Sequence, residues 1–297
     1  MNIVVTGGAG FIGTNSLYYL KNKYPAAKIY SFDIGQPVFP VNDVEYIHGD
    51  IRSYTHLKEV LKGAELVFHF AAELGTHETF LNPEVTNDVN INGTLNLLTL
   101  AREYNYKLLV ASKPNIWLNP YSVSKHAMEL YCLMFYKEYG VRVSILEFFS
   151  VYGPYQYIYK YQKAVPYFIY RALINEYIPI YGNGEQQADF VYVQDVVKAA
   201  DLIMEKEIFG SIIEFATGVG TKVNVLAKMI IEKTNSKAEL KYLPMRIGEE
   251  ENAIIIANTN NAKNILNYMP EHNLELGLEK TILFYKDWVK RQSFLKF

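Results

Sequence analysis

A tyrosine and a lysine four residues apart, Tyr121 and Lys125, are the pair in this sequence best suited to proton transfer. The spacing places both side chains on one face of a helix, one turn apart. A lysine ammonium beside a tyrosine favours the phenolate and lowers the pKa of the phenol from about 10 toward the working pH. Such a phenol can take the proton of a substrate hydroxyl while a hydride leaves the same carbon. The pair is frequent by chance, so its meaning depends on the elements around it.

A glycine-rich segment near the start of the chain, TGGAGFIG, offers a partner for that chemistry. Its glycines Gly7, Gly10 and Gly13 lie between an expected strand and an expected helix. They suit a tight turn, a close approach of the backbone to a pyrophosphate and close helix–strand packing, in that order. The helix begins at Phe11 and Ile12, and its free N–H groups suit phosphate oxygens. The segment predicts a dinucleotide site.

An aspartate some twenty residues further on, Asp33, strengthens this prediction and narrows the cofactor. At the end of the second expected strand it would accept hydrogen bonds from the adenosine ribose hydroxyls. Its charge would repel a 2′-phosphate and no arginine follows it, which favours NAD over NADP. Asp50 in HGDIR could bind the adenine amino group, with Ile51 against the ring. An ordinary turn role for Asp50 stays open.

The elements that must position these residues alternate between short apolar runs and longer helical patterns. This alternation is typical of βαβ units, and continuous apolar runs such as LVFHF suit buried parallel strands. We therefore expect an α/β fold with a Rossmann-type doubly wound parallel sheet. The expected strands cover 2–6, 28–32, 44–48, 66–70, 107–111 and 143–146, and the expected helices 11–22, 54–61, 87–104 and 120–139.

The rhythm changes after residue 150, where a loop rich in Tyr, Gly and Pro covers 152–162. We expect an NAD-binding Rossmann domain over 1–150, joined by segments near 188–217. The remainder, 151–297, is expected to form mainly a smaller substrate-binding lobe over the carboxyl edge of the sheet, where ligands bind in such folds. In this half the expected helices are 165–175, 195–206, 221–234, 260–267 and 276–291, and the expected strands are 190–193 and 212–215.

Composition restricts the partners. The chain has 297 residues with a net charge of −2, which gives no basic field for nucleic acid or for a membrane surface. Its apolar runs fall short of the ~18 residues that a membrane span needs. The lone Cys132 excludes an internal disulfide and a cysteine metal cluster, and the six histidines lack metal-ligand spacing. We expect a cytoplasmic protein without a metal.

Further motifs follow in chain order, and with them the chain resembles the extended short-chain dehydrogenase/reductases. Within these it is similar to the NAD-dependent sugar-nucleotide epimerase/dehydratase group, including UDP-glucose 4-epimerase-like proteins. The motifs cover nearly the whole chain and are TGGAGFIG at 6–13, Asp33, GDIR at 49–52, FHFAA at 68–72, VNINGTLNLL at 89–98, NPYSVSK at 119–125, FFSVYGPYQ at 148–156, IYGNGEQQADFVYVQDV at 180–196 and GLEKTILFYKDW at 277–288.

The resemblance implies roles for further residues. Tyr121 and Lys125 would be catalytic, and both would also contact the cofactor. Thr79 falls where the family commonly has a serine facing the sugar. Arg246 falls where an arginine often binds the nucleotide diphosphate, although a surface role for it stays open. Cofactor contacts or support would come from Phe70, Ala71, Ala72 and Asn90.

The sequence departs from the family pattern at the end of the fifth strand. A serine or threonine is usual there, followed by a longer loop to the tyrosine, whereas here the segment is ASKPNIWLNPY. Ser112 is the expected catalytic hydroxyl, but alignment from the strand places that position on Lys113, as a cationic substitute or a substrate contact. The carboxylates that dehydratases carry next are absent, which favours epimerisation.

Other departures concern the substrate. Ser150 replaces an asparagine, and Ala188 replaces an arginine that would contact a diphosphate. A cation at position 160, 163 or 246 could compensate. Glu73 is a candidate sugar contact beside His77, although both could be solvated loop residues.

Three functions follow. The leading hypothesis is an NAD-dependent sugar-nucleotide epimerase that transiently oxidises a sugar carbon, carbon 4 by analogy, of a UDP-sugar. The alternatives are a 4,6-dehydratase or other oxidoreductase of the family, and a binding protein that has lost catalysis. By analogy we also expect a homodimer formed through helices 87–104 and 120–139, whose apolar residues include Leu130, Leu133, Met134 and Phe135.

Overall fold

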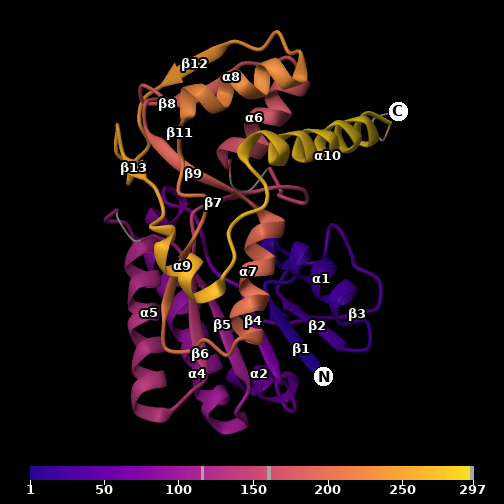
Figure 1. Cartoon of the computed structure of the whole chain (residues 1–297), viewed down its shortest axis with the longest axis vertical. Helices are drawn as coiled ribbons and strands as arrows, with labels where there is room; N and C mark the ends of the chain where they lie inside the picture. Colours follow the sequence, from indigo (N-terminus) through magenta and orange to yellow (C-terminus); the bar gives the residue numbers. More distant parts are fainter. Residues whose placement is uncertain (115–116, 159–161, 295–297) are drawn as a thin grey trace.

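A computed structural model describes residues 1–114, 117–158 and 162–294 (Figure 1). Its centre is a seven-stranded sheet in the order β3-β2-β1-β4-β5-β6-β10, with every neighbouring pair parallel. The order reverses between β1 and β4, which opens a crevice at the carboxyl ends of these strands. The predicted doubly wound sheet is confirmed. Its strands are β1 (Asn2–Thr6), β2 (Lys28–Asp33), β3 (Val44–His48), β4 (Leu66–His69), β5 (Lys107–Ser112), β6 (Val143–Phe148) and β10 (Ile212–Phe215).

Helices cover both faces of this sheet because its strands are apolar on both sides. One face packs against α1 (Phe11–Lys23), α7 (Val193–Glu205) and α9 (Thr259–Leu266). The other packs against α2 (Tyr54–Val60), α4 (Gly93–Tyr104) and α5 (Pro120–Tyr139). Three elements from the second half of the chain, α7, β10 and α9, thus return to the sheet. The expected domain division at 150 remains a prediction.

The helix predicted over 87–104 is interrupted. A 3₁₀ turn (Glu78–Phe80) and α3 (Pro83–Asn87) lead into a π turn (Asp88–Asn92), and α4 follows directly. A π turn widens the helix by one residue and is frequent at functional sites. Here it contains Asn90, which is buried.

The smaller lobe lies above the parallel sheet in Figure 1 and has its own core. Its helices are α6 (Ala164–Leu173), α8 (Val223–Thr234) and α10 (Leu274–Phe294). Around β9 (Gln187–Tyr192) gather β7 (Ser150–Tyr152), β11 (Gly220–Lys222) and β13 (Ile254–Ile255), while β8 (Ile178–Tyr181) pairs in parallel with β12 (Leu240–Leu243).

The lobe contains five strands that the sequence pattern did not predict, β7, β8, β11, β12 and β13. They are two to four residues long, too short for a period of two to stand out, and β8 includes Pro179. The helix predicted from residue 221 begins at Val223, because Gly220–Lys222 pairs with β9 instead. Tertiary pairing overrode the local pattern.

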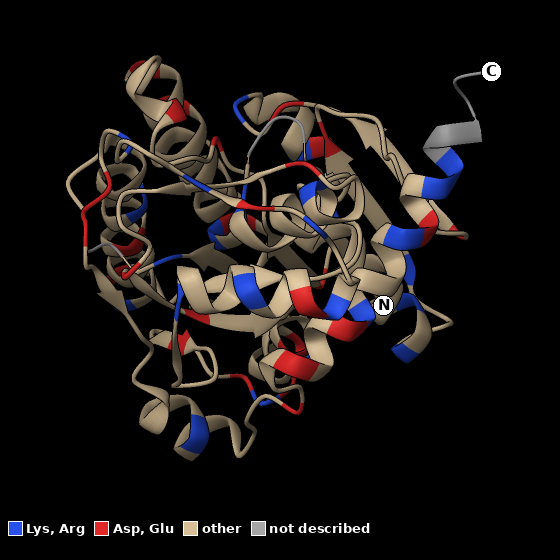
Figure 2. Cartoon of the chain, turned by 90° about the horizontal axis from the view of Figure 1, so that it is seen from above, with Lys and Arg blue, Asp and Glu red and all other residues tan. Residues whose placement is uncertain are grey.

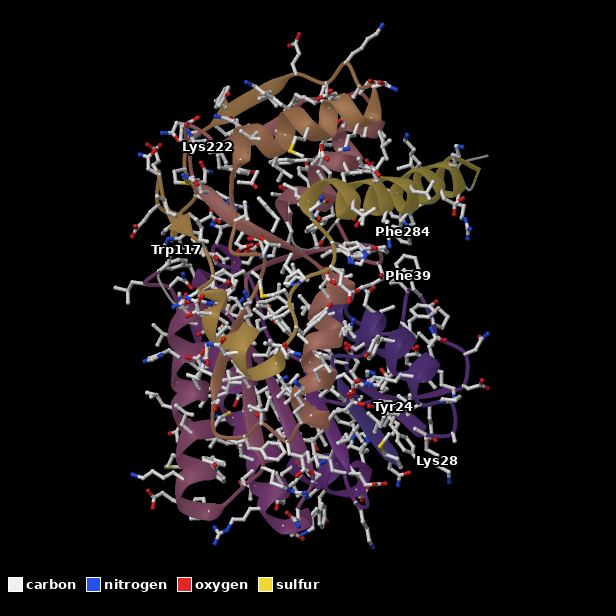
Figure 3. All side chains as sticks on the ribbon, in the orientation of Figure 1. Tyr24, Lys28, Phe39, Trp117, Lys222 and Phe284 are labelled. Carbon is white, nitrogen blue, oxygen red and sulfur yellow. The ribbon has the colours of Figure 1, made fainter. Side chains whose placement is uncertain are left out.

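Aromatic side chains join the two lobes beside the crevice. The ring of Phe39, in the loop after β2, lies 5.6 Å from that of Phe284 on α10 (Figure 3). Tyr155 contacts both rings at 5.0 Å and stacks on Tyr18 of α1 at 5.1 Å. This cluster fixes α10 against the β2–β3 loop.

The surface carries both signs of charge, and Figure 2 shows acidic and basic residues interspersed along the ribbons. Within the described ranges, no helix is long and apolar enough to cross a membrane, and no group of three or more His, Cys, Asp or Glu could hold a metal ion. On α5, Leu130 and Met134 are exposed. Phe135, which was expected on that apolar face, packs in the core instead, because it lies on the sheet side of the helix.

Candidate active site

The glycine turn between β1 and α1 lies against the end of β4. Gly7 has φ +74°, and a Cβ added to it would lie 2.5 Å from the backbone nitrogen of Ala71. A Cβ on Gly13 would lie 2.1 Å from the carbonyl oxygen of Gly7, so helix and turn pack as closely as the sequence predicted. Gly10 caps α1 without a side-chain hydrogen bond, and the first turn carries no acidic residue. This cradle of backbone N–H groups fits a dinucleotide pyrophosphate.

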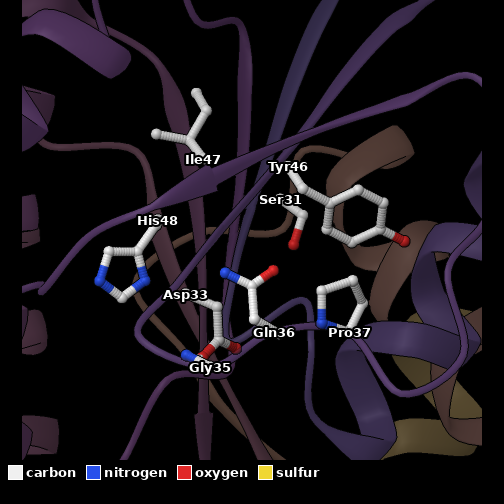
Figure 4. Close-up of a pocket in the computed structure, with 8 residues that line it drawn as sticks. All are labelled: Ser31, Asp33, Gly35, Gln36, Pro37, Tyr46, Ile47 and His48. Atoms are coloured by element: carbon white, nitrogen blue, oxygen red, sulfur yellow. The ribbon is translucent and has the colours of Figure 1, made fainter.

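Asp33 ends β2 and braces the glycine turn. One carboxylate oxygen accepts from the N–H of Ala9 at 3.0 Å and the other from the N–H of Gly35 at 2.8 Å. It borders a pocket at the carboxyl ends of β2 and β3 (Figure 4). The residues that line this pocket are Ser31, Asp33, Gly35, Gln36, Pro37, Tyr46, Ile47 and His48. The position suits an adenosine ribose next to the turn.

Residues of the HGDIR segment make their contacts with one another or with the core of the protein. Arg52 holds Asp50 through its Nη2 at 2.6 Å and its Nε at 3.0 Å, and these hydrogen bonds keep the pKa of Asp50 below its usual value. The side chain of Ile51 is 5% exposed and packs in the core under α2 and α4. A contact from either residue to an adenine ring therefore stays a prediction.

Asn90 joins the β4 edge to α5. Its Oδ1 accepts from the N–H of Glu73, and its Nδ2 donates to the carbonyl of Glu73 and to Ser124 Oγ, each at 2.9 Å. Ser124 Oγ donates in turn to the carbonyl of Tyr121 at 2.9 Å. The segment Phe70–Ala72, which leads into Glu73, is thereby held beside the glycine turn.

A buried histidine extends this network to β1. His69 Nδ1 lies 2.7 Å from Thr6 Oγ1, and its Nε2 lies 3.0 Å from Thr94 Oγ1. Because Thr94 Oγ1 donates to the carbonyl of Asn90 at 2.7 Å, it must accept from His69 Nε2–H. Burial, with the charge of Lys125 in second place, lowers the pKa of His69 to about 3. The imidazole is therefore a neutral structural link whose charge does not change near neutral pH.

The tyrosine and lysine predicted to be catalytic lie in the first turns of α5. The side chain of Asn119 caps this helix by accepting from the N–H of Ser122 at 2.9 Å. Lys125 is 3% exposed and donates from Nζ to the carbonyl of Ala111 at 2.8 Å. Burial lowers the pKa of this ammonium to about 8. Tyr121 is half-buried at the carboxyl edge of β5.

The two candidates at the end of β5 point in different directions. Ser112 is 4% exposed, and its hydroxyl donates to Glu129, itself buried under α5. Lys113 instead reaches α5 beside Tyr121, where Nζ donates to Ser122 Oγ at 2.7 Å. It lies 5.5 Å from the centroid of the Tyr121 ring.

Carboxylates gather beneath this edge, and sequence reasoning missed them. Glu147 hydrogen-bonds to Glu129, and burial with the neighbouring charges of Glu129 and Glu214 raises the pKa of Glu147 to about 8. Strand register places Ser112, Glu147 and Glu214 in one row. Glu129 could have been found, because it stands four residues after Lys125 on the same helix face.

The predicted substrate residues are held by separate local contacts. Thr79 is buried and donates to the carbonyl of Gly75 at 2.8 Å. Ser150 opens β7, paired with Phe190. Arg246 forms an ion pair with Glu249, with N–O distances of 2.5 and 3.1 Å, so one carboxylate already balances its charge. Lys160, a possible substitute for the family arginine, lies outside the described residues.

The arrangement places a glycine turn, an aspartate, a neutral buried histidine and a Tyr–Lys pair around one crevice. The sequence model of the GDP-mannose 4,6-dehydratase family matches residues 4–281 of this chain. The chain belongs to this family.

Two proteins named UDP-glucose 4-epimerase are similar to this chain. A putative UDP-glucose 4-epimerase of Methanocaldococcus jannaschii is 30% identical over 311 aligned positions, which cover 98% of this chain and 99% of the relative. A UDP-glucose 4-epimerase of Thermotoga maritima, solved with UDP-glucose, is 30% identical with a TM-score of 0.92, over 97% of this chain and 100% of that one.

A 4,6-dehydratase is also similar to this chain. The dTDP-glucose 4,6-dehydratase of Bacillus anthracis, solved with NAD, is 26% identical with a TM-score of 0.85, over 97% of each chain. The predicted membership of the sugar-nucleotide epimerase/dehydratase group, the enzyme class and the NAD cofactor are therefore confirmed.

Proposed function

We propose that this protein is an epimerase of UDP-sugars that inverts carbon 4 by transient oxidation. The observation that carries the proposal is the position of Tyr121 at the carboxyl edge of β5, with Lys125 buried one helical turn further on. Residues 113–120 contain no Asp or Glu that could serve elimination. Epimerisation needs only reversible proton and hydride transfer at one carbon, together with room for the ketosugar to rotate.

Each residue has a defined task in this proposal. Tyr121 takes the proton of the sugar hydroxyl and later returns it. NAD, when bound, would supply the reversible hydride transfer at the sugar carbon. Lys125 is anchored on Ala111, which leaves its remaining N–H groups for the nicotinamide ribose. Asp33 accepts from the adenosine ribose, and the glycine turn holds the pyrophosphate.

We assign the residues that contact the substrate from their positions and chemical groups. We infer that Glu73 and Ser150 contact the sugar, that Thr79 shapes its pocket from within the 3₁₀ turn, and that Arg246 binds the diphosphate. The Thermotoga maritima relative, solved with UDP-glucose, supports a UDP-sugar as the substrate class. Arg246 would have to share its charge between Glu249 and the diphosphate.

The test is turnover by purified protein. UDP-glucose, UDP-N-acetylglucosamine and UDP-glucuronate are incubated with the enzyme and NAD, and the sugar products are resolved by chromatography and NMR. We expect conversion to the 4-epimer without net accumulation of NADH. Absence of turnover across this panel, despite NAD binding, would contradict the proposal and favour a binding protein.

A 4,6-dehydratase is the second candidate, and one observation favours it. The Lys113 ammonium beside Tyr121 has a pKa lowered to about 8, mainly by burial, so it could exchange a proton during elimination. This alternative predicts a 4-keto-6-deoxy sugar and the release of water. The same product analysis distinguishes the two reactions.

Assembly and location are part of the proposal. We propose a homodimer formed through α4 and α5, because α5 exposes the apolar side chains of Val123, Leu130 and Met134 along one face. We also propose a cytoplasmic setting, since the single cysteine, Cys132, is a buried free thiol.

A further inference from the structure

The end of β5 presents an ammonium group where the proposed chemistry takes place. Lys113 Nζ donates to Ser122 Oγ and to the carbonyl of Pro114, each at 2.7 Å. These bonds hold it 5.5 Å from the centroid of the Tyr121 ring. Among the described residues they account for two of its three N–H groups, so one donor remains for a ligand beside the phenol.

The hydroxyl of the neighbouring Ser112 makes its hydrogen bond away from Tyr121. Ser112 shares its face of β5 with Val110, which packs in the core under α5. Its single proton is donated to Glu129, and its side chain is 4% exposed. A substrate oxygen beside Tyr121 would therefore meet the amino group of Lys113 and not this hydroxyl.

The reaction needs a second donor on that oxygen. When a hydride returns to the keto carbon, negative charge develops on the oxygen until a proton reaches it. A donor fixed in advance at that point lowers the barrier, and the loss of one such donor typically costs about 10²–10³-fold in kcat.

We propose that Lys113 is this donor, a catalytic residue that takes the place of a hydroxyl at the end of β5. The proposal rests on the proposed epimerase function. In the oxidation step, the C–H and O–H bonds of the sugar carbon break and a carbonyl forms. The hydride goes to NAD and the proton to Tyr121, while Lys113 donates a hydrogen bond to the oxygen and keeps its own protons. The return step reverses each transfer.

The electrostatics of the site agree with this role. The pKa of Lys113 is lowered to about 8, mainly by burial and to a smaller extent by the charges of Lys163 and Lys125. Glu129 acts in the opposite direction, and a pKa of about 8 leaves the ammonium mostly charged at neutral pH. An ammonium whose pKa is this low is a stronger hydrogen-bond donor than the ammonium of an exposed lysine.

The experiment removes the amino group and then supplies it from solution. In Lys113→Ala we expect kcat to fall about 10²-fold or more, with a smaller change in KM. Ethylammonium should restore part of kcat in a concentration-dependent manner, whereas tetramethylammonium, which has no N–H, should not. Lys237→Ala, at an exposed lysine of the smaller lobe, is the matched control and should retain wild-type kcat.

A second variant compares the two candidates directly. Ser112→Ala should lower kcat much less than Lys113→Ala does, because its hydroxyl bonds Glu129. NAD affinity and thermal unfolding report whether each variant is folded. If Lys113→Ala retains more than about a tenth of wild-type kcat, or is folded but unresponsive to ethylammonium, the proposal is wrong. Wild-type turnover tests the epimerase function separately, since only the variant-to-wild-type ratios test Lys113.

Discussion

The charged side chains at the end of β5 depend on burial for their chemistry. Lys125 and Lys113 both have pKa values lowered to about 8, with burial as the main cause. Each is nevertheless hydrogen-bonded to a backbone carbonyl, which keeps the ammonium in place. Tyr121 thus has Lys113 Nζ 5.5 Å from its ring centroid and Lys125 one helical turn further along α5.

Removal of the phenol is the simplest test at this scale. In Tyr121→Phe we expect the loss of at least about 10²-fold in kcat, because proton transfer typically contributes that much. Folding and NAD affinity should be unchanged, since the half-buried ring remains. Turnover of a UDP-sugar, NAD titration and thermal unfolding provide the measurements. More than a tenth of wild-type activity would exclude Tyr121 as the base.

The raised pKa of Glu147 leads us to expect that the stability of the protein depends on pH. Its pKa is raised from 4.5 to about 8 in the folded protein, so the folded state binds an extra proton between these values. The unfolding free energy should therefore fall, through this group, as the pH rises from about 4.5 through about 8.

Glu147→Gln removes that titration. Its Tm should match the wild type near pH 5 and exceed it by a few degrees at pH 8, since 1 kcal/mol corresponds to about 2–4 °C in a chain of this size. Scanning calorimetry at both pH values is the measurement. Equal Tm differences at the two pH values would show that Glu147 is ionised in the folded protein.

The helices and strands bring separate segments to one edge of the sheet. The π turn before α4 directs Asn90 toward Glu73 and Ser124, and His69 connects this point to Thr6 at the end of β1. The glycine turn packs on the residues after β4 at the same edge. The glycine turn and α5 are therefore connected through the end of β4.

Gly13→Ala tests the packing of α1 on the turn. The new Cβ would lie 2.1 Å from the carbonyl oxygen of Gly7, so the turn must shift. We expect NAD affinity to fall at least tenfold, measured by calorimetric titration. Gly140→Ala is the control: its φ is +66° but nothing lies near the added Cβ. It should cost about 1 kcal/mol of stability and leave NAD affinity unchanged; equal affinity losses would refute the explanation.

The whole molecule combines a parallel sheet with a smaller lobe fixed above its carboxyl edge. The aromatic cluster of Phe39, Tyr155 and Phe284 ties the last helix to the loop after β2, and Figure 3 shows Phe39 and Phe284 side by side. On the opposite flank, α5 leaves apolar side chains uncovered. A surface of this kind is typical of subunit interfaces.

Leu130→Glu tests the proposed dimer. The side chain is 56% exposed at the middle of α5, and a charge there would be buried without a partner in a symmetric interface. We expect a monomer by light scattering where the wild type is a dimer. Leu283→Glu, at a 71% exposed leucine on α10, should leave the dimer intact. A monomeric wild type would refute the proposal.

Local patterns in the sequence determined much of this protein. The strands of the parallel sheet follow from continuous apolar runs, and the glycine turn follows from three glycines at fixed spacing between a strand and a helix. Asp33 and the Tyr121–Lys125 pair are likewise properties of one segment each. Such features depend on backbone geometry within a few residues, so the sequence alone carries them.

Only the tertiary structure decided which groups meet. Ser112 and Lys113 are adjacent in sequence, yet β5 directs the first under α5 and leaves the second beside Tyr121. The neutral state of His69 and the raised pKa of Glu147 depend on strand register and on the packing of α4 and α5. Desolvation and partner choice arise from segments far apart in the chain, and no local pattern encodes them.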